Sequence, residues 1–123
     1  MRSLTNITLL VLFVFLFTGC QQQVKPPLYL WNNYVDSSTE YGMKDHEKEI
    51  LEKHLVELEK IINQSEEKKQ RVAPGIYAEY AQLLIETNKA SDAKKYFLLE
   101  KSTYPESTIF IDRVMKKIYG GES

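Results

Sequence analysis

Cysteine is almost missing from this chain of 123 residues, in which Cys20 is the only one. A single cysteine excludes an internal disulfide and a cysteine-rich zinc site. A charge excess is missing too, because 16 Lys and Arg stand against 17 Asp and Glu, for a formal net charge of −1. Nucleic-acid binding relies on a clustered basic excess, so this balance gives no electrostatic basis for it. The length suits one domain, and 43% hydrophobic residues are typical of a globular protein.

Histidine is scarce as well, with only His46 and His54. On a helix they would stand about 12 Å apart, too far for one metal ion without a third element. Ile50, which lies four residues from each, has no ligating atom. We expect both histidines to be exposed or partly packed. The chain also has no glycine-rich phosphate loop and no nucleophile elbow, so we expect no enzyme activity, no metal and no cofactor.

Long apolar runs are confined to the first twenty residues. Residues 7–17 are almost wholly apolar, Arg2 precedes them, and Thr18-Gly19-Cys20 follows. A charged start, a short apolar centre and small residues at the cut are typical of a secretory signal peptide, and the run is too short to span a bilayer. The segment ending at Cys20 resembles the bacterial lipobox, with Phe17 where Leu is usual. The alternatives are an uncleaved anchor or a secreted protein with an incidental cysteine.

The lipobox resemblance implies a boundary and a location. Residues 1–19 would be removed as a signal peptide, and Cys20 would be lipidated at the new amino terminus. By analogy with lipoprotein sorting in Gram-negative bacteria, Gln21 in place of Asp implies the outer membrane, and we expect the domain to face the periplasm. In a Gram-positive cell, the same anchor would hold the outer face of the cytoplasmic membrane. Residues 20–27 would form a polar tether, because two prolines at its end favour an extended chain.

Residues 28–119 have the apolar spacing of an all-α domain, and no useful stretch alternates with period two. Leu51, Leu55, Leu58 and Ile62 form one stripe of a helix predicted over 45–70. Further helices are predicted over about 74–87, 91–104 and 107–119, which makes four. Before them, residues 28–41 are predicted as an extended aromatic segment with one or two helical turns. Residues 120–123 should fray.

The segment 74–107 has the length of a tetratricopeptide unit. Tyr77, Tyr80, Ala81, Ala93, Phe97 and Pro105 fit its pattern, whereas Glu100 stands where Ala is expected. One degenerate unit, flanked by the two other helices, is one interpretation. An ordinary helical hairpin with the same spacing is the other, and the two predict nearly the same packing.

Several segments together resemble the domain-of-unknown-function 4810 family of small bacterial lipoproteins. They are residues 28–31, 74–78, 93–97, 100–101 and 104–112, with Tyr34 and Tyr41. Asn32 stands where members usually have Gly. The resemblance implies an outer-membrane lipoprotein, commonly encoded beside a CsgG-like pore-forming lipoprotein and another small lipoprotein, both of which are possible partners. The implied function is that of a non-enzymatic adaptor or accessory subunit in envelope assembly or secretion. A regulator of a cell-wall synthesis enzyme is the alternative.

The best candidates for partner binding are aromatic. Tyr29, Trp31, Tyr34 and Tyr41 lie close together in sequence, and aromatic side chains dominate binding hot spots. A small helical domain also needs apolar cover, so the same residues could complete the core. Both interpretations hold if one edge of the cluster stays exposed.

Overall fold

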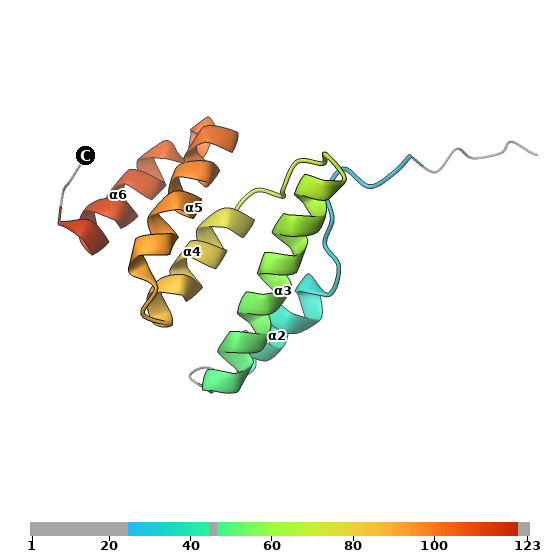
Figure 1. The fold of residues 1–123 in the computed structure, drawn as a ribbon, viewed down its shortest axis with the longest axis horizontal. Helices are drawn as coiled ribbons and strands as arrows, with labels where there is room; N and C mark the ends of the chain where they lie inside the picture. The colour runs from blue at the N-terminus through green and yellow to red at the C-terminus, as the bar shows by residue number, and fades with distance from the viewer. Residues whose placement is uncertain (1–24, 45–46, 121–123) are drawn as a thin grey trace, which may run out of the picture.

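The computed structural model describes residues 25–44 and 47–120 (Figure 1). The described part of the chain is all-α: five α-helices, one short 3₁₀ helix and no strand. The α-helices are α2 (Tyr34–Met43), α3 (Lys48–Glu67), α4 (Ile76–Glu86), α5 (Ala90–Thr103) and α6 (Thr108–Tyr119), and η1 (Pro105–Ser107) joins the last two. The predicted signal peptide, Cys20, His46 and residues 121–123 lie outside the described residues.

The helices form a stack in chain order. Substantial contacts join α2 to α3, α3 to α4, α4 to α5 and α5 to α6. In Figure 1, α6, α5, α4 and α3 follow one another from left to right, and α2 lies against α3. Helices α2 and α6 therefore lie at opposite ends of the stack. Within the described residues, no helix is both long and apolar enough to cross a membrane.

Helix α3 is buried on two sides because it lies between α2 and α4. The predicted stripe is confirmed: Leu55, Leu58 and Ile62 are buried, and Leu51 is partly buried. A second buried row runs along the same helix through Ile50, His54, Leu58, Ile61 and Ser65. These residues recur every three or four positions, so they share one side of the helix.

The predicted hairpin is present as α4 and α5. Ala81 and Ala93 are fully buried, which lets the two helices approach closely. Phe97 fills the space beside them, and the rings of Tyr80 and Tyr96 meet edge to face at 4.6 Å. Gly75, with φ of 89°, adopts the left-handed conformation that starts α4, and glycine reaches it without strain.

Several predicted boundaries are wrong. The described residues form five α-helices instead of four, because residues 34–43 form a helix of 10 residues instead of one or two turns. Helix α3 ends at Glu67 instead of residue 70, because Lys69 turns into the left-handed region at φ 53° and Gln70 N–H bonds back to the Ser65 carbonyl. Helix α5 begins at Ala90, one residue before the predicted start at Ser91, and Lys89 is at its N-cap position.

Candidate interaction site

The segment before α2 lies antiparallel to α3 and is fixed to it by hydrogen bonds. Gln70 Nε2 donates to the Pro27 carbonyl at 2.9 Å, and Asn32 Nδ2 donates to Gln64 Oε1 at 3.0 Å. The backbone N–H of Asn33 donates to Glu57 Oε1 at 2.9 Å. Asn32 has a φ of 40°, so the turn before α2 forms here with Asn, which tolerates this conformation well.

Three of the four predicted aromatic residues pack against the core, and one remains exposed. Tyr29, Tyr34 and Tyr41 are partly buried beside the core cluster. Trp31 is 44% exposed, and its ring lies 6.3 Å from that of Tyr29 and 5.5 Å from that of Tyr34. Leu28, three residues earlier in the chain, is 74% exposed. The two interpretations of the segment therefore combine: the tyrosines cover the core, and Trp31 forms an open edge.

A chain of hydrogen bonds fixes this segment and α2 to the rest of the molecule. Ser37 Oγ lies 2.9 Å from His54 Nδ1, and His54 Nε2 lies 2.8 Å from Glu79 Oε1. The Tyr34 hydroxyl donates to Glu79 Oε2 at 2.9 Å. Four side chains from α2, α3 and α4 are thus connected. Burial and the bond to Glu79 raise the pKa of Tyr34 to about 12.

The bonding pattern of this network accommodates either protonation state of His54. With a neutral ring, Ser37 O–H donates to Nδ1 and Nε2–H donates to the Glu79 carboxylate. With a protonated ring, Nδ1–H donates to Ser37 Oγ, and the serine hydroxyl then donates to the Tyr34 carbonyl, which lies 3.1 Å away. In both states each ring nitrogen retains a partner.

Ser37, His54 and Glu79 are bonded in the order of a hydrolytic triad. Unlike the residues of a triad, however, the serine and the histidine are not accessible to a substrate. His54 is 0% exposed and Ser37 is 3% exposed. A triad serine has to reach a carbonyl carbon beside oxyanion-binding donors. Here the serine hydroxyl is enclosed between helices, so the group acts as a structural connection between α2, α3 and α4.

The prediction that the histidines are exposed or partly packed is wrong for His54. It lies in the second buried row of α3, where a ring with two hydrogen-bond partners replaces an apolar side chain. Ser37, which was not among the candidate residues, is the one buried residue of α2. The row at residues 50, 54, 58, 61 and 65 was the sequence signal for this burial.

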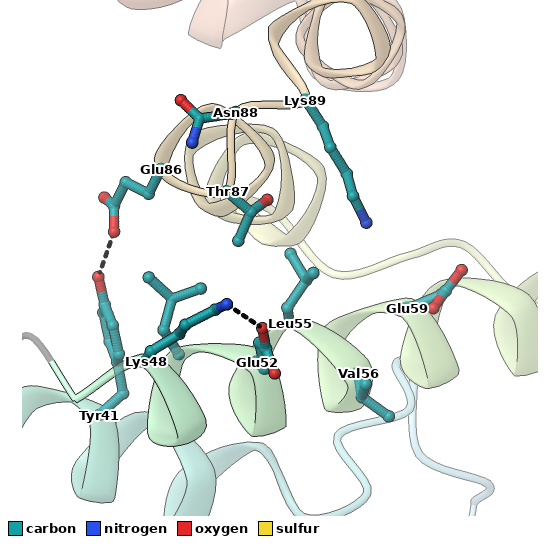
Figure 2. A pocket seen from close by; sticks show the side chains of 11 residues that line it. Tyr41, Lys48, Glu52, Leu55, Val56, Glu59, Glu86, Thr87, Asn88 and Lys89 are labelled. Atoms are coloured by element: carbon teal, nitrogen blue, oxygen red, sulfur yellow. Dashed lines mark hydrogen bonds and ion pairs between the residues drawn. The ribbon is translucent and has the colours of Figure 1, made fainter.

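An open pocket of about 1070 Å³ lies between α3 and the turn from α4 to α5 (Figure 2). Leu51 and Leu55 supply its apolar lining, and Tyr41 stands at one edge, where its hydroxyl donates to Glu86 at 2.9 Å. Lys48 pairs with Glu52 at 3.7 Å, while Lys89 extends toward α3 from the opposite wall. Groups of both signs line the opening. Within residues 25–44 and 47–120, no cluster of three or more His, Cys, Asp or Glu is placed to hold a metal ion.

Glu100, the departure from the repeat pattern, binds the start of α4. It is 3% exposed, and its Oε1 accepts from Gly75 N–H at 2.8 Å. Burial raises the pKa of Glu100 above its usual 4.5, and the backbone N–H groups of Gly75, Ala78 and Tyr77 counteract part of that rise. Alanine could not supply this acceptor, which explains why a carboxylate stands here.

The neighbouring residues fix the same end of the hairpin. Tyr104 O–H donates to the Val72 carbonyl at 2.6 Å, and the Arg71 guanidinium lies 5.0 Å from the Tyr104 ring centre. Lys101 forms an ion pair with Asp112 of α6 at 2.6 Å. The segments around residues 74 and 104, which carry part of the family resemblance, thus lie close together in the structure. Their contacts fix the start of α4 and the end of α5.

These features define a small all-α protein with a buried polar network and an exposed aromatic edge. The chain belongs to the family described as Domain of unknown function (DUF4810), whose model matches residues 28–114, more than half of the chain. The match begins at the aromatic segment and ends within α6. No curated protein and no solved structure shows significant similarity to the chain.

Proposed function

We propose that the protein is a non-enzymatic lipoprotein of the bacterial outer membrane that faces the periplasm and serves as an adaptor or accessory subunit. Its partner would be another envelope protein, with a CsgG-like pore-forming lipoprotein as the expected one. Lipidated Cys20 would hold the domain at the membrane through the polar tether of residues 20–27. Two acyl chains already give stable membrane attachment.

The exposed edge at Trp31 supports this proposal most directly. Tryptophan is among the residues that contribute most to protein–protein affinity when a partner covers them. Trp31 is 44% exposed, yet Tyr29 and Tyr34 border its ring and the Asn33 backbone is bonded to α3. A side chain that is already oriented loses little conformational entropy on binding.

A pull-down in mild detergent tests the partner. Full-length tagged protein with Trp31→Ala should lose a partner that the wild type recovers, while its helical circular-dichroism signal is kept. Leu98→Ala is the matched control, because Leu98 is 48% exposed on α5, away from the aromatic segment. Recovery of a pore-forming lipoprotein supports the adaptor role. Recovery of a cell-wall synthase instead would replace it with the regulatory role, and equal recovery with Trp31→Ala contradicts the binding edge.

Metabolic labelling with radioactive palmitate tests the anchor separately. The wild type should incorporate label, and Cys20→Ser should not. Absence of label in the wild type, or equal label in both, would remove lipidation from the proposal. Because the aromatic edge lies in a different segment, the pull-down result is independent of this outcome.

A further inference from the structure

The last helix of the stack leaves one side uncovered by any described element. Ile109 is 69% exposed and Phe110 is 60% exposed, while Arg113, Lys116 and Lys117 are also exposed. Residues 109, 113 and 116 share one side of the helix, and residues 110, 113 and 117 overlap with it. Asp112, the single acid of α6, lies at the edge of this face beside Ile109 and Lys116, where it pairs with Lys101 of α5. The outer face of α6 is therefore apolar at its start and basic along its length.

The first helix of the stack has a matching uncovered side. Val35 is 68% exposed and Met43 is 75% exposed, and Asp36 and Thr39 are exposed between them. Helix α2 contains no basic residue, and its other acid, Glu40, bonds to Lys53 of α3. The outer face of α2 is therefore apolar and carries one acid, Asp36.

We propose that the outer face of α6 binds the outer face of α2 of a second copy, so that chains associate head to tail. Three observations favour this occupant. The faces lie at opposite ends of one helical stack, both expose large apolar side chains, and they carry charges of opposite sign. Stacked helical units commonly need a neighbour to cover their end faces. Because the faces differ, the contact is heterologous and generates a ring or an open filament, not a closed two-fold dimer.

The size of the faces predicts a weak contact. Helices of 10 and 12 residues are about 15 and 18 Å long, so each face buries less than the roughly 800 Å² per partner of a standard interface. The fraction of associated chains should therefore rise with protein concentration, and association should be incomplete at micromolar concentrations. Because the contact would bring basic side chains close to an acidic one, the association should also be weaker at high salt.

Sedimentation of the full-length protein in mild detergent tests the proposal. The wild type is compared with two variants, each of which has one of the two faces blocked. Val35→Lys places a charge on the α2 face that repels the basic α6 face, and Phe110→Gln removes the largest apolar side chain from the α6 face. Both positions are exposed, so the fold should persist, and Leu98→Lys on α5 is the matched control. The wild type and the control should gain mass with concentration, whereas each blocked variant should stay a monomer. An equimolar mixture of the two blocked variants should form a dimer and nothing larger, because one intact pair of faces remains.

Photocrosslinking in cells decides between this occupant and others. With p-benzoylphenylalanine in place of Phe110, the crosslink should reach residues 31–44 of a second copy. A crosslink to lipid, to residues 1–24, to another protein or to α6 of a second copy would overturn the proposal. A wild type whose mass does not change with concentration, or a mixture that yields no dimer, would overturn it too.

Discussion

Helices α4 and α5 are joined by buried small and aromatic side chains, whereas α2 is joined to α3 and α4 by polar groups. The hairpin buries Ala81, Ala93 and Phe97 almost completely. Helix α2 buries only Ser37, and it is held by the bonds of Ser37, Tyr34 and Tyr41 together with the partly buried rings of the two tyrosines beside His54. Apolar burial contributes in proportion to area, while each hydrogen bond contributes only about 1 kcal/mol net. Helix α2 and the segment before it, which carries Trp31, are therefore well oriented but less strongly held than the α4–α5 hairpin.

The hairpin should show the largest loss of stability on truncation. Phe97→Ala removes a ring that is 1% exposed at the contact of α4 and α5. Loss of apolar burial and the cavity left behind should lower the free energy of unfolding by about 3–5 kcal/mol. Denaturant titration measures this change. A loss below about 1 kcal/mol would mean that the hairpin is not the main core.

The polar network should respond less strongly and more locally. His54→Ala removes the partner of both Ser37 and Glu79, so it should cost about 2–3 kcal/mol. The loss should fall mainly on α2, which hydrogen exchange resolves by segment. Val56→Ala on the same helix is the control, because Val56 is 61% exposed. Equal loss of protection in α2 and α5 would contradict a local role.

The Glu100 carboxyl should make stability depend on pH. Its pKa is raised in the folded protein, so the unfolded chain ionises first as the pH rises. The free energy of unfolding should thus fall as the pH rises from about 4.5 through the raised pKa. Glu100→Gln keeps an acceptor for Gly75 N–H and should remove this part of the fall. Glu100→Ala loses the acceptor and should cost about 1–2 kcal/mol near pH 4. The cost should be smaller at higher pH, because only the wild type loses this stability as Glu100 ionises. Thermal unfolding between pH 4 and pH 8 checks all three proteins.

Sequence patterns predicted the apolar half of the structure better than the polar half. The stripe at Leu51, Leu55 and Leu58 and the pair Ala81 and Ala93 follow helical spacing, so they could be predicted. Helix α2 could not, because its core side is formed by tyrosines and one serine, which do not make an apolar stripe. The contact of Ser37 with His54 joins residues 17 positions apart, and their spacing alone does not indicate it.

The roles of the aromatic candidates could be predicted only in part. Composition identified Tyr29, Trp31, Tyr34 and Tyr41 as core or interface residues. It could not show which of them pack against the core and which stays exposed. The division follows from hydroxyl groups: Tyr34 and Tyr41 reach Glu79 and Glu86 of α4, and Tyr29 packs against the core cluster. Among the described residues, no hydrogen bond holds the Trp31 side chain against the core.

Hydrogen exchange of the unmodified protein tests the central contrast most directly. Amides of α2 should open with a lower free energy than amides of α4 and α5, because polar contacts hold the first and apolar burial holds the others. The account predicts that residues 36–43 exchange clearly before residues 80–86 and 94–103. Protection of α2 equal to or greater than that of the hairpin would contradict it.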